Sequence, residues 1–361
     1  MKILRIYLKL PPLFGGMEKH IYQLTKYQLS DGHYVKVLYN DGEIISNSDE
    51  RICRYKLHKI KPQFIGVFIF YFLCIIRLIR NREKFDVVHI HGDWSSLIFI
   101  SFIKRIIKAK VSVFSIHDQL SKSITHKIIL PFFIRYSDLV FSTGYDTACK
   151  LENLSKKKVY FQPSGINELF FINRKNKINA SDNEKFKIIT VANLYPKKNV
   201  ELIIEIAKIL KNFEFVVIGD GSHKAVLQTI ISSEDIDNVI LAGFKTPLEI
   251  VSYYHISDCF LFTSYAEGTP TSILEAMSCG LPIVSSKAGG INHIIHDNKN
   301  GFIVDDFDAY NYANKILLLK NDNDLRLKIG FNNKILAENY RWKKVAGFIT
   351  EVVEKEFNEK N

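Results

Sequence analysis

The stretch that decides the fold is CFLFTSYAEGTPTSILEAMSCGLPIVSS, residues 259–286. An apolar run at 259–263 leads into a turn, a helical pattern follows Pro270, and a second apolar run occupies 282–285. Proline suits the first position of a helix, because its fixed φ is already helical and its missing N–H would have no partner there. The pattern therefore predicts a strand, a crossover helix and a second strand parallel to the first.

The same alternation of short apolar runs and helical patterns extends over most of the chain. In the first half, strands are expected at 2–8, 34–39, 86–90, 110–116, 139–142 and 159–162. In the second half, they are expected at 187–192, 213–219, 239–242, 259–263, 282–285 and 302–304. Continuous apolar strands separated by helices are typical of parallel sheets covered on both faces. The rhythm occurs twice, which predicts two doubly wound α/β domains.

The expected domain boundary is a polar segment near the middle of the chain. Residues 172–186, INRKNKINASDNEKF, are rich in asparagine and lysine and have no apolar periodicity. We expect a first Rossmann-like domain at 1–170, a linker at 171–186 and a second Rossmann-like domain at 187–339. The amphipathic segment at 340–361 is expected to form a helix that packs back on the first domain.

Charge is distributed unevenly between the two halves of the 361-residue chain. The first 180 residues carry a net charge of +15 and the remainder −4, which gives +11 in total. A basic half indicates a polyanionic partner, either an anionic membrane surface or nucleic acid. Two basic segments at 104–110 and 122–135 contain aliphatic and aromatic residues, which suits a membrane interface. A solvated basic face explains the same residues, and both interpretations stay open.

The length of the apolar runs and the cysteines indicate where the protein works. The longest apolar run, 64–76, is shorter than the roughly 20 residues that span a bilayer, so it predicts a buried or interfacial helix. The five cysteines are scattered and form no CxxC pair, which disfavours a disulfide framework and a zinc site. Together these features predict a cytoplasmic protein, and contact with the inner face of the plasma membrane is expected if the basic segments form a membrane patch.

Two carboxylates flank the turn and helix of the fold-deciding stretch. Glu267 lies on the loop, and Glu275 follows it by eight residues, about two helical turns along. The N-terminus of the helix between them has free N–H groups and a positive dipole end, which favour a phosphate. Carboxylates on either side of bound phosphates are suited to accept hydrogen bonds from sugar hydroxyls. Taken alone, Glu267 is explained equally well as a charge at the helix N-terminus, and Glu275 as an acidic residue on the helix surface.

The segment EGTP-x4-EAM-x2-G-x-P-x-V, followed by Gly289 and Gly290, resembles the E-x7-E motif of the GT4-type glycosyltransferases. These are retaining enzymes with the GT-B fold, in which two Rossmann-like domains face each other across a cleft. The resemblance extends over most of the chain. It implies that Glu267 contacts hydroxyls of the transferred sugar and Glu275 the ribose of the nucleotide. It also implies that the backbone at Gly268, Thr269 and Pro270 meets the sugar and diphosphate.

Three further segments resemble parts of the same family's donor site. In VANLYPKKN, Lys198 matches a lysine that neutralises the donor diphosphate, whereas Asn193 replaces the family's arginine and Lys197 is a candidate to compensate. Gly219 and Gly221 match a glycine turn near the nucleotide. Near the N-terminus, GGME resembles the family's glycine loop, which implies a donor contact for Gly16 and an acceptor contact for Gly15. Glu18 is explained equally well as a first-turn helix acid.

Three histidines follow strands of the first half. His89 and His91 alternate on one strand and therefore face the same side, and His117 ends the next strand. We interpret His89 as a buried, hydrogen-bonded side chain. The resemblance implies that His117, together with Glu267, belongs to the catalytic centre, and that His91 lies on the acceptor side.

The DxD-like strings of the chain predict helix caps in preference to a metal site. Asp306 and Asp308 precede a helical pattern, where aspartate caps free N–H groups, and similar strings occur at 235–237 and 322–324. We therefore expect no obligatory metal or other cofactor, with cationic side chains and helix dipoles meeting the charge of the diphosphate.

The sequence thus predicts a glycosyltransferase that moves a sugar from a nucleotide donor, with UDP as the expected nucleotide, to a glycan or lipid-linked acceptor. The resemblance implies retention of configuration and a place in bacterial O-antigen or capsule synthesis. A sugar-nucleotide epimerase of the same fold is the alternative, although the E-x7-E motif and its turn disfavour it. A phosphorylase would need a pyridoxal-bearing lysine that the sequence does not identify. A nucleic-acid-binding protein is disfavoured because no recognised motif accompanies the basic segments.

Overall fold

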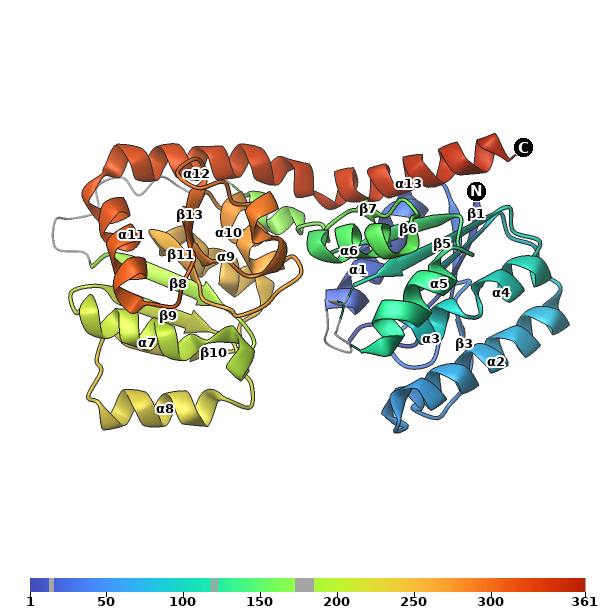
Figure 1. Cartoon of the computed structure of the whole chain (residues 1–361), viewed down its shortest axis with the longest axis horizontal. Coiled ribbons are helices and arrows are strands. Elements are labelled where there is room, and N and C mark those ends of the chain that lie inside the picture. The colour runs from blue at the N-terminus through green and yellow to red at the C-terminus, as the bar shows by residue number, and fades with distance from the viewer. Residues whose placement is uncertain (13–15, 118–119, 121–122, 173–184, 361) are drawn as a thin grey trace. The chain divides into compact units, whose positions relative to one another are not determined.

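The computed structural model describes residues 1–12, 16–117, 120, 123–172 and 185–360. The chain divides into two compact units, one formed by 1–165 with 342–361 and the other by 166–341. Figure 1 shows the helices and strands of both units in order of the sequence. The expected linker at 171–186 lies largely outside the described residues.

The first unit is a parallel sheet of seven described strands in the order β3-β2-β1-β4-β5-β6-β7. Its strands are β1 (Lys2–Ile6), β2 (Tyr34–Tyr39), β3 (Glu50–Arg51), β4 (Val87–His91), β5 (Val111–Ile116), β6 (Leu139–Ser142) and β7 (Tyr160–Phe161). Its helical segments are α1 (Gly16–Ser30), η1 (Leu57–Lys59), α2 (Gln63–Asn81), α3 (Trp94–Leu97), α4 (Ile100–Ile106), the π-helical η2 (Thr125–Ile129), α5 (Leu130–Ile134), α6 (Tyr145–Ser155) and α13 (Trp342–Glu359).

The second unit is a parallel sheet of six described strands in the order β10-β9-β8-β11-β12-β13. Its strands are β8 (Lys187–Val191), β9 (Glu214–Ile218), β10 (Val239–Gly243), β11 (Cys259–Phe262), β12 (Ile283–Ser286) and β13 (Gly301–Val304). Its helical segments are η3 (Glu168–Phe171), η4 (Pro196–Lys198), α7 (Val200–Ile209), α8 (Lys224–Ser233), α9 (Pro247–Ile256), α10 (Thr271–Ser278), η5 (Gly289–His293), α11 (Ala309–Asn321), α12 (Asn323–Ala337) and η6 (Glu338–Tyr340).

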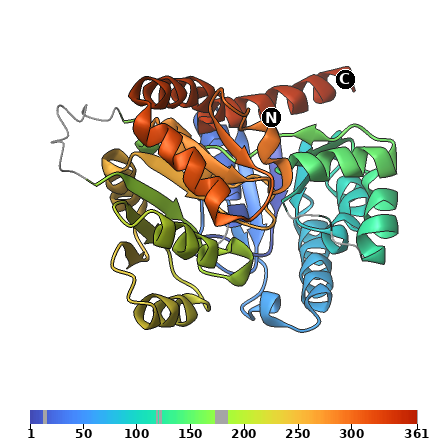
Figure 2. The ribbon, with the colours of Figure 1, turned by 60° about the vertical axis from the view of Figure 1, so that its left-hand side comes forward.

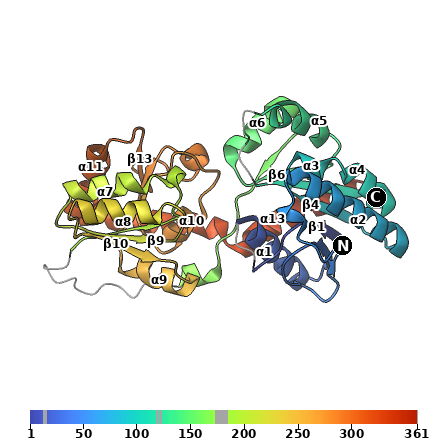
Figure 3. The same ribbon diagram turned by 90° about the horizontal axis from the view of Figure 1, so that it is seen from below.

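Each sheet is covered by helices on both faces, so each unit has two apolar cores. In the first unit, α2 to α6 pack on one face and α1 with α13 on the other. In the second unit, α7, α8 and α11 cover one face and α9 and α10 the other, as Figure 3 shows. Successive residues of a strand enter opposite cores, as Ile3 and Leu4 do in β1. Two doubly wound α/β units were expected from the sequence, and this prediction is confirmed.

The first unit ends earlier than the boundary expected at 170. Ile166 and Phe170 are buried in the core of the second unit, beside Tyr254 and Cys279. The thiol of Cys279 donates to the carbonyl of Phe170 at 3.4 Å, which fixes η3 in that unit. The polar segment at 172–186 indicated roughly where the boundary lies. The burial of Ile166 and Phe170 shows that residues 166–170 belong to the second unit.

The last helix, α13, is an integral part of the first unit. Its buried side chains include Trp342, Val345 and Ile349, which pack in the core beneath α1. The side-chain amide of Gln28 on α1 donates to Thr350 Oγ1 at 3.1 Å. Gly165 packs so closely on Trp342 that an added Cβ would lie 2.6 Å from the indole ring. The chain therefore returns to the first sheet after it completes the second.

We predict that Ile349→Ala lowers the free energy of unfolding of the first unit by about 2–4 kcal/mol, because it leaves a cavity beneath α1. Both tryptophans of the chain, Trp94 and Trp342, lie in this unit, so their fluorescence in urea reports its unfolding. Glu351→Ala, on the exposed face of the same helix, is the matched control and should change stability little. Equal stability of the two variants would contradict the packing role of α13.

Candidate functional site

In the second unit, two loops meet where the strand order reverses between β8 and β11. Lys198 ends the short helix η4 in the loop after β8, and Glu267 lies in the loop after β11. Thr263 Oγ1 donates to the carbonyl of Lys198 at 3.0 Å, and the N–H of Tyr265 donates to the carbonyl of Lys197 at 3.0 Å. Ligands of open α/β sheets bind at such a reversal, outside the carboxyl ends of the strands.

The two charged side chains expected at the donor site contact each other directly. The ammonium group of Lys198 donates to a carboxylate oxygen of Glu267 and forms an ion pair with it. Each side chain is 15% exposed, so the pair is partly shielded from water but reachable from it. The sequence placed both residues near a donor but did not predict their contact. The exposed residues Asn193 and Lys197 lie on the same loop as Lys198.

The helix after Glu267 begins without a side-chain cap. Pro270 precedes α10 and its side chain accepts no hydrogen bond from the first turn. Among the described residues, the hydroxyl of Thr269 is buried without a hydrogen-bond partner. Free N–H groups of a first turn and an unsatisfied hydroxyl are donors for an anion. Gly268 lies on the same turn, and Glu275 lies in the second turn of α10 with a partly exposed side chain.

Gly219 and Gly221 are required by backbone packing between neighbouring loops. Gly219 has a φ of +140°, and an added Cβ would lie 1.8 Å from the carbonyl oxygen of Ala192. A Cβ on Gly221 would lie 2.3 Å from the carbonyl oxygen of Leu194. The N–H of Leu194 in turn donates to the carbonyl of Asp220 at 2.9 Å. The two glycines thus hold the loop after β9 against the loop that carries Lys198.

Two aspartates of the DxD-like strings act as helix caps. Asp308 accepts from the N–H of Tyr310 at the start of α11, and Asp322 accepts from the N–H of Leu325 at the start of α12. Asp306 accepts from the side-chain amide of Asn311 at 2.8 Å. The capping interpretation is confirmed for Asp308 and Asp322, whereas Asp306 precedes the cap of α11 and accepts from the N–H of Asp308 at 3.1 Å. Among the described residues, no group of three or more His, Cys, Asp or Glu side chains is placed to hold a metal ion.

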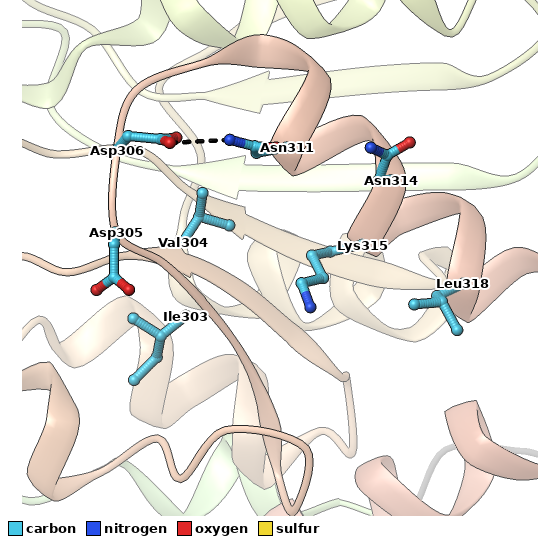
Figure 4. Close-up of a pocket in the computed structure, with 8 residues that line it drawn as sticks. All are labelled: Ile303, Val304, Asp305, Asp306, Asn311, Asn314, Lys315 and Leu318. Atoms are coloured by element: carbon cyan, nitrogen blue, oxygen red, sulfur yellow. Dashed lines mark hydrogen bonds between the residues drawn. The ribbon is translucent and has the colours of Figure 1, made fainter.

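Asp306 also borders a surface hollow of about 420 Å³ beside β13 and α11, shown in Figure 4. The hollow is lined by Ile303, Val304, Asp305, Asp306, Asn311, Asn314, Lys315 and Leu318. The figure shows Asn311 bonded to Asp306. The ammonium group of Lys315 lies 5.0 Å from the centre of the Phe302 ring. The predicted donor-site residues are not among those that line this hollow.

In the first unit, four histidines gather at the carboxyl ends of β4 and β5. The rings of His89 and His91 stack with centroids 4.1 Å apart, which confirms that they share a face. His91 Nδ1 lies 3.2 Å from His117 Nε2. His89 Nε2 lies 2.8 Å from Ser115 Oγ, so the interpretation of His89 as a buried, hydrogen-bonded residue is confirmed. Among the described residues, His91 Nε2 is buried without a hydrogen-bond partner.

The fourth member, His20 on α1, was missed by the sequence analysis. Its ring meets that of His117 edge-on at 4.7 Å and that of Trp342 at 5.2 Å. Its Nδ1 lies 3.0 Å from Ser164 Oγ. A single histidine on an amphipathic helix carries no signal of its own, and only the fold brings it beside the others.

The N-terminal glycine loop is described only in part. Gly15 lies outside the described residues, whereas Gly16 begins α1, is exposed and has open space beside its Cα. Glu18 is buried in the first turn of α1, where it accepts from Tyr7 and pairs with Lys9 at 3.0 Å. It therefore serves as an acidic first-turn residue whose charge is neutralised by the loop after β1.

Burial keeps the histidine cluster neutral near pH 7. It lowers the pKa of His20, His89, His91 and His117 below the ordinary value, and positive neighbours such as Arg5 lower the first three further. Arg5 is itself fully buried, bonded to Thr25 and Gln28, and burial lowers its pKa to about 9. Neutral imidazoles present one donor and one acceptor each.

We predict that the first unit loses stability as the pH falls below about 6.5. The unfolded chain then binds protons that the buried imidazoles exclude, so each of them lowers the free energy of unfolding by about 1.4 kcal/mol per pH unit until its own lowered pKa is reached. His89→Gln should reduce this slope in urea unfolding followed by tryptophan fluorescence. The exposed His296→Gln is the control, and identical slopes for all three proteins would contradict the prediction.

Comparisons with known proteins identify the family of both units. Residues 171–355, just over half of the chain, match the model of the glycosyl transferases group 1. Residues 14–168 match the model of glycosyltransferase family 4. The two matches meet close to the boundary between the units.

Individual relatives agree with this assignment. An uncharacterised glycosyltransferase of Methanocaldococcus jannaschii is 23% identical over 95% of each chain. AmsK, the amylovoran biosynthesis glycosyltransferase of Erwinia amylovora, is 30% identical over 54% of this chain and 47% of its own length. The structure of Anabaena HepE in complex with UDP superposes with a TM-score of 0.79 at 19% identity, covering 98% of this chain and all of HepE. The expected GT-B fold is thereby confirmed, and the chain belongs to the group 1 (GT4-type) glycosyltransferases.

Proposed function

We propose that the second unit binds a nucleoside diphosphate sugar at the loops after β8 and β11. The observation that carries this proposal is the Lys198–Glu267 ion pair beside the uncapped N-terminus of α10. The site thus brings together the Lys198 cation, the free N–H groups of α10 and the unsatisfied hydroxyl of Thr269, and each of these groups favours binding of a diphosphate. UDP is the proposed nucleotide, supported by the Anabaena HepE structure in complex with UDP.

The ion pair also indicates how the site changes when a donor binds. A diphosphate competes with Glu267 for the ammonium group of Lys198, because both are anions that accept its hydrogen bonds. Displacement of Lys198 releases the Glu267 carboxylate, which then accepts hydrogen bonds from hydroxyls of the transferred sugar. Glu275, in the second turn of α10, is proposed to bind the ribose. The exposed Lys197 supplies a second positive charge on the loop where Asn193 replaces arginine.

Catalysis in this proposal rests on stabilising the leaving nucleoside diphosphate. As the glycosidic bond to the diphosphate breaks, negative charge grows on its oxygens, and preorganised donors meet that charge without reorganisation. Lys198 and the first turn of α10 supply these donors, so no metal ion or other cofactor is required. We propose that the configuration at the anomeric carbon is retained, through attack from the face that the leaving group occupied.

The acceptor is proposed to bind the first unit near Gly16, His91 and His117. A neutral His117 is suited to hydrogen-bond a hydroxyl group without adding a positive charge to the site. The proposed acceptor is a lipid-linked oligosaccharide of bacterial surface-polysaccharide synthesis, handled in the cytoplasm at the inner face of the plasma membrane. The likeness to AmsK, a biosynthetic enzyme of the polysaccharide amylovoran, supports this choice, as does the basic first half of the chain.

Removal of Lys198 should weaken nucleotide binding. Lys198→Ala deletes a charge-assisted hydrogen bond, so the affinity for UDP should fall by about ten- to a hundredfold. Glu275→Ala should also weaken UDP binding, whereas Glu267→Gln should retain UDP and lose sugar transfer. Titration calorimetry with UDP and a transfer assay measure the two effects. The control is Lys208→Ala, which removes a comparable lysine paired with Glu234 on another surface of the same unit. Unchanged UDP affinity in Lys198→Ala would refute the donor site.

Transfer should persist after metal removal. We expect EDTA to leave the initial rate of transfer unchanged, because Lys198 and the α10 N-terminus meet the charge that a metal ion would otherwise neutralise. Addition of Mg²⁺ or Mn²⁺ to the EDTA-treated protein is the control. A rate that vanishes with EDTA and returns with either metal would overturn this part of the mechanism.

A further inference from the structure

Helix α2 is apolar on both of its faces, which is unusual for a surface helix. Its sequence, QFIGVFIFYFLCIIRLIRN, has one charged position before Arg80, namely Arg77. One face, which includes Phe70, Cys74 and Leu78, is buried in the core of the first unit. A helix that is hydrophobic all round is ordinarily covered on every side by protein or by lipid. The opposite face of α2 is covered only in part by the described residues, and its apolar side chains stay 37–60% exposed.

The uncovered face forms a stripe along the whole helix, which we call the α2 stripe. Its members recur at helical spacing and are exposed: Phe64, Ile65, Phe68, Ile69, Phe72 and Ile79. Figures 1 and 2 show α2, in blue, at the periphery of the first unit. Contiguous exposed apolar surface of this kind marks an interaction site with protein or membrane.

Neighbouring elements extend the apolar surface. Trp94 on α3 lies against the stripe, with ring centroids 6.3 Å from Phe64 and 6.5 Å from Phe68. The helix α4, which packs beside α2, exposes Phe102. A tryptophan at the edge of apolar surface is typical of the membrane interface, because its ring is apolar and its N–H is polar.

Basic residues flank both ends of the stripe. Lys56, Lys59 and Lys61 precede α2, and Arg80, Arg82 and Lys84 end or follow it, all of them exposed. Between 54 and 84, the sequence contains eight lysines and arginines and one acid, Glu83, which pairs with Lys36. An apolar surface with cations at both ends is complementary to anionic lipid, where acyl chains take the apolar residues and headgroups take the cations.

We propose that the α2 stripe docks the first unit on an anionic lipid bilayer, with the helix lying in the plane of the interface. Among the described residues, α2 is the one helix long and apolar enough to span a membrane by length and composition. Spanning would withdraw Phe70, Tyr71 and Leu78 from the core of the first unit, whereas docking keeps them in place. This inference deepens the proposed lipid-linked acceptor, but it depends on the surface of the first unit and not on the donor site.

Flotation of the full-length protein with vesicles tests the docking surface. The wild type should float with vesicles of mixed phosphatidylglycerol and phosphatidylcholine and float poorly with phosphatidylcholine alone. The double variant Phe72→Ser, Ile79→Ser should bind the mixed vesicles roughly a hundredfold more weakly, at about tenfold for each large apolar side chain. Arg80→Glu with Lys84→Glu should weaken binding at low salt and have less effect at high salt.

A matched control removes apolar surface elsewhere. Leu327 and Phe331 on α12 are 61% and 65% exposed, comparable with Phe72 at 60% and Ile79 at 52%. Leu327→Ser with Phe331→Ser should leave flotation unchanged. Equal losses in the two double variants would show general adhesion of apolar surface and overturn the proposal. Urea unfolding followed by tryptophan fluorescence, which reports the first unit, distinguishes misfolding of the stripe variants from loss of docking, and UDP affinity reports separately on the donor site of the second unit.

Tryptophan quenching locates the bilayer on the protein. Vesicles of phosphatidylglycerol with brominated phosphatidylcholine should quench Trp94, which lies at the stripe, and spare the buried Trp342. Trp94→Phe should therefore abolish the quenching without abolishing flotation. Quenching that persists in this variant would place another surface at the bilayer. Self-association in solution by sedimentation, without flotation, would make a second copy the occupant of the stripe and also refute the proposal.

Discussion

The parallel pairing of the strands is the constraint on which the rest of both units depends. A parallel sheet needs a crossover after each strand, and the crossover helices cover both faces of the sheet. Side chains along the strands therefore enter apolar cores, as Val87 and Val88 do on opposite faces of β4. Chemistry is confined to the carboxyl ends, where strands give way to loops. Both clusters of candidate residues lie at those ends, and in each unit they lie next to the reversal of strand order.

Backbone contacts then fix the loops that the sheet edge brings together. Gly219 and Gly221 allow the loop after β9 to touch the loop after β8, and Thr263 and Tyr265 bond that second loop to the one after β11. Lys198 is thus held from both sides before any ligand arrives. These bonds fix the backbone that carries the Lys198 side chain, which lowers the entropy lost when its ammonium group stabilises a leaving group. The sequence motif around these residues therefore determines a packing arrangement as well as a set of polar side chains.

The sequence predicted strands, helices and motifs, which depend on neighbouring residues, and missed contacts between residues that are distant in the chain. Apolar runs located the strands except β3, whose two residues Glu50 and Arg51 carry no apolar signal. The motif around Glu267 located the loop at the strand reversal, since its turn and helix start are local. His20 and the Lys198–Glu267 contact were missed, because each joins segments that only the fold brings together. The sequence predicted a buried or interfacial helix at 64–76, but a helix with apolar residues on all sides does not show which of its faces lies outward.

In the first unit, the groups that attract anions differ from the groups that are candidates for chemistry. The excess of positive charge belongs to exposed lysines and arginines such as those that flank α2, whereas the histidines at the strand ends are kept neutral by burial. Exposed charges act over about 10 Å at moderate ionic strength, so they recruit an anionic surface without fixing the geometry of a hydroxyl group. Neutral imidazoles can fix the geometry of a hydroxyl group through directed hydrogen bonds, but they attract a distant anionic surface only weakly because they carry no net charge. Arg5 is a positive charge that belongs to the buried cluster and not to the surface. It lowers the pKa of His89 and His91 and so helps to keep both imidazoles neutral. The net charge of +13 in the sequence of this unit, from 30 lysines and arginines and 17 aspartates and glutamates, therefore describes its surface, whereas the chemistry at its strand ends depends on burial.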